Sequence, residues 1–135
     1  MSYPVSGVGS IGPEAVAKLK AIRVRTTATV LERASTPKGR KTLAAEAGLD
    51  ETVILKLANI ADLTRVPGIA LDYAELLEAA GVDTVPDLRS RNPANLARLV
   101  ARLNQNHKIV QVPPSEKMLA KWIERARALP VKMTY

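Results

Sequence analysis

The sequence predicts an all-α protein of about eight short helices, and three observations support this fold class. Apolar residues recur at helical spacing, and residues that start or stop helices stand between these stretches. Only residues 109–112 alternate in the manner of a strand. Aromatic residues make up 3 % of the chain and Phe is absent, so the core must consist of Ala, Leu, Val and Ile, which suits close-packed short helices.

Four helix starts are expected in the first half of the chain. Each lies at a Pro or at a side chain that can accept a hydrogen bond from a free N–H group of the first turn. They are Pro13, Thr26, the run Ser35-Thr36-Pro37 and Asp50. The third helix should end at Gly48, and the fourth, from Glu51 to about Ile60, carries an apolar face.

The second half continues in the same way. Pro67-Gly68 marks a turn before a helix from about Ile69 to Ala80. The string Thr84-Val85-Pro86-Asp87 resembles a capping box that opens a short helix. Asn92-Pro93 should open another helix and Ser115 the last one, to about Leu129, with an extended link over residues 107–114.

The chain contains an internal repeat with an offset of 58 residues. At this offset apolar positions fall on apolar positions, and one capping threonine falls on another. The matched pairs are Ile11 and Ile69, Val16 and Ala74, Leu19 and Leu77, Val24 and Val82, Thr26 and Thr84, and Val30 and Leu88. Each copy therefore predicts a hairpin, an apolar-striped helix, a tight turn and a short antiparallel helix.

These copies resemble the helix-hairpin-helix family, whose pattern is Gly-apolar-Gly, spaced apolar residues, a turn Gly and a Thr cap. Copy one carries it from Ser10 to Thr26, and copy two from Gly68 to Thr84. More narrowly, Tyr73 to Val85, Arg91 to Leu96 and Trp122-Ile123 are similar to an uncharacterised bacterial family of tandem helix-hairpin-helix-like proteins. This resemblance covers nearly the whole chain, and it implies a fold but no established activity.

The length fits one helical domain, residues 1–135. The resemblance divides this domain into a first repeat, connecting helices, a second repeat and C-terminal helices that end in a closing helix. These parts comprise residues 7–34, 35–64, 65–91 and 92–135.

The resemblance also implies a phosphate-binding hairpin. In the family, free N–H groups at the hairpin bind a phosphate oxygen of a nucleic-acid backbone, and Gly permits the close approach. The corresponding backbone in copy one belongs to Gly9, Ser10, Ile11 and Gly12, and the nearby cations include Lys18, Lys20, Arg23 and Arg25.

Both copies depart from the family pattern. Each keeps one hairpin glycine, because Ser10 replaces the first in copy one and Ala70 replaces the second in copy two. The position after the helix-opening Pro, often Lys in DNA binders of the family, is Glu14 in copy one. The corresponding region of copy two carries the carboxylates Asp72, Glu75 and Glu78. Carboxylates repel phosphate, so copy two is expected to be a packing unit.

The charge distribution favours an acidic partner. The formal charge is +7, with the basic excess in residues 1–50 and 96–135 and an acidic middle. The densest basic stretch, with Lys38, Arg40 and Lys41, opens a helix. The sequence leaves open whether this stretch binds phosphate or is a solvated turn.

Other motifs give further readings. Residues 40–60 are compatible with a helix-turn-helix, but the second helix is apolar enough to be core. Gly7 to Gly12 has dinucleotide-binding spacing without the flanking strands, which favours a hairpin loop. The last helix places cations beside Trp122; we expect an amphipathic closing helix, with membrane-surface or nucleic-acid contact as the alternative.

Composition excludes several kinds of chemistry. The chain has no Cys, so it has no disulfides, thiolate metal sites or cysteine nucleophiles. His107 is the single His, which leaves no multi-His metal site and no Ser–His triad. We therefore predict no cofactor, metal ligand or catalytic residue. The sequence shows no signal peptide and no apolar run of about 18 residues, which predicts a cytoplasmic protein without a membrane partner.

The sequence thus predicts a non-enzymatic protein that binds nucleic-acid backbones through the hairpin N–H groups of copy one and the basic stretch with Lys38, Arg40 and Lys41. No sequence preference is expected, and DNA is favoured over RNA. The alternative is a protein–protein interaction scaffold built from the same repeats, which the acidic second copy favours. The oligomeric state is not predicted.

Overall fold

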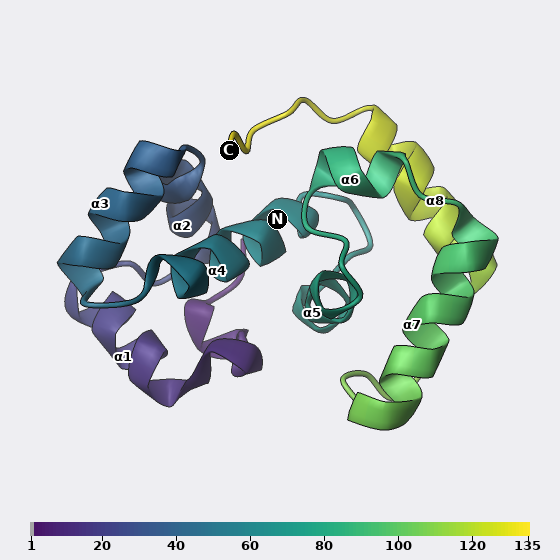
Figure 1. The fold of residues 1–135 in the computed structure, drawn as a ribbon, viewed down its shortest axis with the longest axis horizontal. Helices are drawn as coiled ribbons and strands as arrows, with labels where there is room; N and C mark the ends of the chain where they lie inside the picture. The colour runs from purple at the N-terminus through teal and green to yellow at the C-terminus, as the bar shows by residue number, and fades with distance from the viewer. Residues whose placement is uncertain (1) are drawn as a thin grey trace.

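The computed structural model describes residues 2–135 and confirms the all-α fold class. Within these residues there are eight α-helices, two short 3-10 helices and no strand beyond an isolated bridge between Pro4 and Thr26. The short ones are η1 (Val5–Gly7) and η2 (Gly9–Ile11). The α-helices are α1 (Gly12–Ala21), α2 (Thr27–Ala34), α3 (Pro37–Ala47), α4 (Glu51–Leu63), α5 (Leu71–Ala79), α6 (Val85–Arg89), α7 (Pro93–His107) and α8 (Glu116–Arg127) (Figure 1).

Five helix starts carry the expected side-chain caps. In each, a side-chain oxygen accepts a hydrogen bond from a backbone N–H group two or three residues later, which satisfies a donor that the helix itself leaves free. The capping residues are Thr26, Thr36, Asp50, Asn92 and Ser115. α3 ends at Gly48 in the left-handed conformation, as predicted.

Two expectations about local structure are wrong. The side chain of Thr84 makes no cap; the Val85 N–H group donates instead to the Asp62 carboxylate at 2.8 Å. Residues 107–114 do not form an extended link, because α7 continues to His107 and the chain bends over Val110 to Val112. The bend follows from the buried Asn104 side chain, which bonds both the N–H and the C=O group of Val110 at 2.9 Å.

The turns of the two repeats have the same geometry. The Val24 N–H group donates to the Leu19 carbonyl, and the Val82 N–H group to the Leu77 carbonyl, both at 2.9 Å. Arg23 and Gly81, which are 58 residues apart, both have positive φ, at 66° and 90°. These bonds satisfy carbonyls that the helix end leaves free. The sequence repeat therefore corresponds to a repeated pair of helices joined by the same tight turn.

α4 forms the centre of the core. From Leu57 to Leu63 every residue of this helix is buried, and the helix packs against α2, α3 and α5. Figure 1 shows α1 to α3 on one side of α4 and α5 to α8 on the other. From Leu57 on, α4 presents no face to a DNA groove; Glu51 and Thr52 at its start are exposed but are poor material for reading bases, which disfavours the helix-turn-helix interpretation of residues 40–60.

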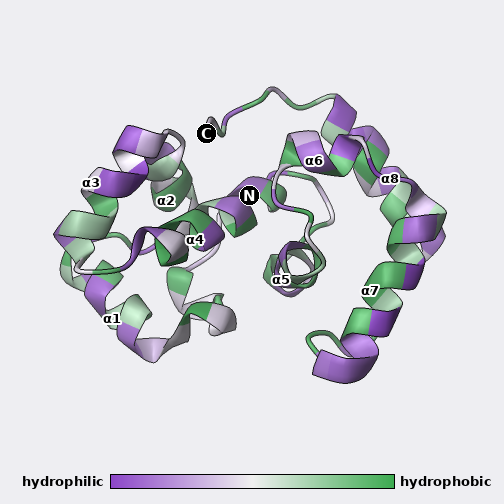
Figure 2. Ribbon diagram, in the orientation of Figure 1, coloured by the Kyte–Doolittle hydropathy of each residue, from purple (hydrophilic) through white to green (hydrophobic). Residues whose placement is uncertain are grey.

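α7 and α8 pack against each other and complete the second half. Figure 2 shows hydrophobic and hydrophilic residues interspersed along both helices, the pattern of helices with one face in the core. Leu119, Trp122 and Ile123 of α8 are buried, as expected for a closing helix. None of the helices within residues 2–135 has the length and apolar character needed to cross a membrane.

The C-terminal segment, residues 128–135, crosses back from α8 toward α2 and α3 (Figure 1). Arginine side chains from both halves bond its backbone carbonyls. Arg89 bonds Leu129, Arg65 bonds Pro130 and Arg40 bonds Thr134. The segment therefore ties the two halves of the molecule together.

Candidate nucleic-acid interface

The hairpin of copy one lies open on the surface. It consists of η2 and the first residue of α1, Gly12, whose φ of 84° is strained for any residue with a side chain. A Cβ atom added at Gly9 or Gly12 would meet nothing within 4 Å. Gly9 and Ser10 are exposed, and Ile11 is half-buried against the core. The α-carbons of Gly9 and Gly12 therefore face open space.

A groove of about 450 Å³ runs from the hairpin along one face of α1. Its walls come from the N-terminal segment before α1 and from α1 positions at helical spacing between Gly12 and Lys20. The lining residues are Ser6, Val8, Gly9, Gly12, Pro13, Val16, Ala17 and Lys20. The hairpin backbone stands at one end of this groove and the exposed ammonium group of Lys20 at the other.

Two further cations lie near the Lys20 end of the groove. The backbone carbonyl of Arg25 accepts a 2.8 Å hydrogen bond from the Val5 N–H group, which places Arg25 beside the segment that lines the groove. Arg23 lies in the turn directly after α1. Both side chains are exposed, and neither forms an ion pair with any residue from 2 to 135. The sequence predicts Arg25 as a site residue, with Lys20 and Arg23 near it.

A carboxylate from the second repeat lies against the same hairpin. The backbone N–H groups of Gly9 and Ser10 face Glu75 of α5. Burial raises the pKa of Glu75 above its ordinary value; the two N–H groups and Lys56 act in the opposite direction without cancelling it. Its Oε1 atom is buried and has no hydrogen-bond partner in the described part of the chain.

The sequence does not predict that Glu75 lies at hairpin one. In the sequence, Glu75 belongs to copy two and indicates only that copy two binds phosphate poorly. The structure places its carboxylate at the hairpin of copy one, because the start of α5 lies against the N-terminal segment, where a Cβ atom on Gly7 would lie 2.8 Å from the Leu71 side chain. No spacing rule gives this contact, since 65 residues separate Glu75 from Ser10 in the chain.

Lys18 lies on a different face of α1. Its ammonium group pairs with Glu14 at 3.3 Å and donates to the carbonyl of Gly48 at 3.2 Å. Lys18 therefore connects α1 to the end of α3 and is not part of the groove, in contrast to its expected place among the phosphate-binding residues.

Arg40 also departs from its expected role in a phosphate site. Its side chain is directed into the molecule, where only 7 % of the residue is exposed. The guanidinium group donates to the carbonyls of Ala34 at 3.0 Å and Thr134 at 2.8 Å, and it lies 5.3 Å from the ring centre of Tyr135. Arg40 holds the C-terminal segment through its hydrogen bond to the Thr134 carbonyl. The residues next to Arg40 in the sequence do not indicate this partner.

Lys38 and Lys41 are exposed near the start of α3, as binding to a phosphate would require. They do not join the hairpin in one site. The far end of α3, at Gly48, is the end that contacts Lys18 of α1. The 11 residues of α3 separate its two ends by about 16 Å. The candidate residues thus form two surfaces, the hairpin groove and the start of α3.

The hairpin of copy two serves packing. A Cβ atom at Gly68, where φ is 99°, would lie 2.9 Å from Nε1 of Trp122. Arg125 of α8 donates to the carbonyl of Pro67 at 2.8 Å, and the ring of Trp122 lies 5.1 Å from that of Tyr73. Gly68 therefore provides the space that α8 needs to close on the second repeat.

The most deeply buried charge is that of Asp62 on α4. It is fully buried and accepts hydrogen bonds from Arg65 at 2.6 Å and from the Val85 N–H group at 2.8 Å. This arrangement joins α4 to α6. From Ser2 to the C-terminus, no group of three or more His, Asp or Glu side chains is arranged to hold a metal ion.

Fold and site together define an all-helical protein with one open, glycine-containing hairpin flanked by cations. DUF4332, a domain of unknown function, matches residues 9–129, and the chain belongs to this family. No solved structure matches the chain.

Proposed function

We propose that the protein is a non-enzymatic, helix-hairpin-helix-like binder of nucleic-acid backbones, with DNA favoured over RNA and no sequence preference. The observation that carries the proposal is the exposed backbone of hairpin one: a Cβ atom at Gly9 or Gly12 would meet nothing within 4 Å, and the N–H groups of Gly9 and Ser10 already face an anionic group, the Glu75 carboxylate, whose place a phosphate would take. Contacts between N–H groups and phosphate fix position but do not read bases, so unrelated sequences should bind equally.

Charge around the groove supports the same function. Lys20, Arg23 and Arg25 are exposed without ion pairs among residues 2–135, so their charges are free for phosphates. The start of α1 adds the partial positive charge of a helix N-terminus. The shared turn geometry of the two copies supports the tandem character of the fold.

A salt titration tests the proposal. Fluorescence anisotropy would follow labelled DNA duplexes of unrelated sequence, single-stranded DNA and RNA as the protein is added at several salt concentrations. We expect the logarithm of the association constant to fall linearly with the logarithm of salt concentration. The double variant Lys20→Gln, Arg25→Gln should reduce the slope by about two, since each phosphate contact contributes about 0.9.

The matched control is Lys117→Gln, Lys121→Gln, which removes the same charge from exposed positions of α8. This control should leave the slope nearly unchanged. Absence of binding at low salt, where a protein of charge +7 attracts polyanions, would reject the proposal. An equal loss in both double variants would place the contact outside the hairpin.

The alternative is a protein–protein interaction scaffold, and one observation favours it. Glu75 already lies at the N–H groups of Gly9 and Ser10. A protein partner that does not use these N–H groups can bind while the carboxylate stays in place. The same titration separates the two functions, because a scaffold of this kind shows no salt-linked binding to nucleic acid that depends on Lys20 and Arg25.

A further inference from the structure

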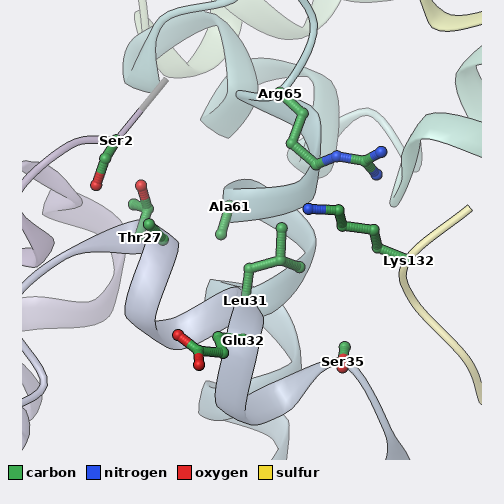
Figure 3. A pocket seen from close by; sticks show the side chains of 9 residues that line it. Ser2, Thr27, Leu31, Glu32, Ser35, Ala61, Arg65 and Lys132 are labelled. Atoms are coloured by element: carbon green, nitrogen blue, oxygen red, sulfur yellow. The ribbon is translucent and has the colours of Figure 1, made fainter. Parts of the chain in front are cut away.

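A cavity of about 620 Å³ lies between α2, α4 and the C-terminal segment, away from the hairpin groove (Figure 3). Its lining comes from four parts of the chain that are distant in sequence: the N-terminal segment, α2, the end of α4 and the C-terminal segment. The lining residues are Ser2, Thr27, Ala28, Leu31, Glu32, Ser35, Ala61, Arg65 and Lys132. This volume falls within the range of small-molecule sites.

The wall that contains Lys132 is fixed at both ends. Before it, the carbonyl of Pro130 accepts a hydrogen bond from Arg65. After it, the Thr134 N–H group donates to the Ser35 carbonyl at 2.8 Å, and Met133 is buried in the core. The segment from 130 to 134 therefore forms an anchored arch, and Lys132 is positioned over the cavity by the fold.

The cavity has a cationic side and an apolar floor. Figure 3 shows the Lys132 ammonium and the Arg65 guanidinium on the same side, with Leu31 below the ammonium group and Ala61 beside it. The charge of Arg65 is balanced by its 2.6 Å ion pair with the buried Asp62. Lys132 forms no ion pair within residues 2–135, so its charge is available.

The remaining charge of the lining is a carboxylate. Glu32 lies in Figure 3 on the side of the cavity opposite to Arg65. An anionic ligand is therefore attracted to the Lys132 side and repelled from the Glu32 side, which orients it along the apolar floor.

We propose that this cavity binds a small amphipathic anion, meaning a carboxylate, sulfonate or phosphate attached to a compact apolar group. Lys132 binds the anionic group in a charge-assisted hydrogen bond, and the apolar group covers Leu31, Ala28 and Ala61. The proposal is independent of nucleic-acid binding, because it shares no residue with the hairpin groove.

The test uses 8-anilino-1-naphthalenesulfonate, an amphipathic anion that fluoresces in apolar surroundings. We expect saturable binding of one molecule per protein chain. Lys132→Gln should raise the dissociation constant about tenfold, because one charge-assisted contact is lost. Ala28→Trp places a large side chain at an exposed position of the lining and should abolish saturable binding. Lys117→Gln, an exposed lysine of α8, should bind as the unaltered protein does.

Helix content and the melting temperature of each variant verify that it folds, and Lys132→Gln changes only an exposed side chain. In a parallel titration, amide chemical shifts should move at Ala28, Leu31 and Lys132. Absence of saturable binding, affinity unchanged in Lys132→Gln, or shifts confined to other parts of the molecule would each overturn the proposal.

Discussion

Glu75 determines how available the N–H groups of hairpin one are. A phosphate that binds Gly9 and Ser10 must share or displace a carboxylate that those N–H groups already face. The buried, unpartnered Oε1 atom makes the charged form of this carboxylate costly in its present place. The second repeat therefore opposes anion binding by the first.

Glu75→Gln should strengthen binding to a DNA duplex severalfold, because it removes a negative charge from the hairpin and keeps the shape of the side chain. Anisotropy titrations at fixed salt measure the change. Glu78→Gln is the control, since this carboxylate pairs with Lys56 at 3.8 Å instead of facing the hairpin. Equal effects of both substitutions would mean that only net charge matters.

The pH dependence of binding should follow the protonation of Glu75. Burial raises the pKa of this carboxyl group, while Gly9, Ser10 and Lys56 stabilise its charge and Asp72 opposes it. Protonation removes the negative charge, so binding should strengthen as the pH falls through this raised pKa. In Glu75→Gln the change over the same interval should be smaller. Titrations from neutral pH downward check this, and parallel curves for the two proteins would contradict it.

The same raised pKa has a consequence for stability. The folded state holds the Glu75 proton more tightly than the unfolded state does, so the contribution to stability is present at low pH and lost as the pH rises through the folded-state pKa. Glu75→Gln should therefore be at least as stable as the unaltered protein at neutral pH, and urea unfolding measures the difference.

At the scale of elements, the packing of α2 against α3 depends on Gly39. A Cβ atom at this position would lie 2.2 Å from the backbone carbonyl oxygen of Arg33, and a backbone atom cannot move aside easily. Gly39→Ala should destabilise the fold by about 1–3 kcal/mol through overpacking.

Urea unfolding at constant pH measures this loss. Gly9→Ala is the matched control, because its Cβ atom would meet nothing within 4 Å. A Gly39→Ala protein as stable as the unaltered one would show that the two helices separate without cost.

Helix starts were predictable because a capping side chain and the backbone N–H group that donates to it lie within three residues of each other. Thr26 and Ser115 follow this rule, and their caps form as expected. Thr84 does not follow this rule: the N–H group of Val85, the first of α6, donates to Asp62, which lies 23 residues before Val85 in the chain. The short helix was predicted, but the side chain that caps it was not.

At the scale of the molecule, Asp62 joins the central helix α4 to α6 and, through Arg65, to the C-terminal segment. Its carboxylate bonds both α6 and Arg65, and Arg65 in turn bonds the C-terminal segment. Asp62→Asn leaves a guanidinium group without its buried counter-charge, which should cost about 3–5 kcal/mol.

Urea unfolding again gives the measurement. Asp87→Asn breaks the pair with Arg91, in which both side chains remain 32 % exposed, and should cost at most about 1 kcal/mol. A loss for Asp62→Asn no larger than that of the control would contradict the role assigned to Asp62.

The sequence repeat led to the two helix pairs, since a fixed offset of apolar residues predicts repeated units. The orientation of individual cations was not predictable. Arg40 and Lys38 stand two residues apart in one basic stretch, yet Arg40 is buried against Thr134 and Lys38 is exposed. That difference depends on a partner 94 residues away. The cavity beside Lys132 was not predictable for the same reason, because its walls come from parts of the chain that are distant in sequence.

The central claim is that hairpin one contacts a nucleic-acid backbone, and the most direct measurement is an NMR titration of isotope-labelled protein with a short DNA duplex. The account predicts amide shift changes at Gly9, Ser10, Gly12 and Lys20, repeated with a duplex of unrelated sequence. Shift changes confined to the start of α3 or to α8, or none at all at low salt, would contradict it.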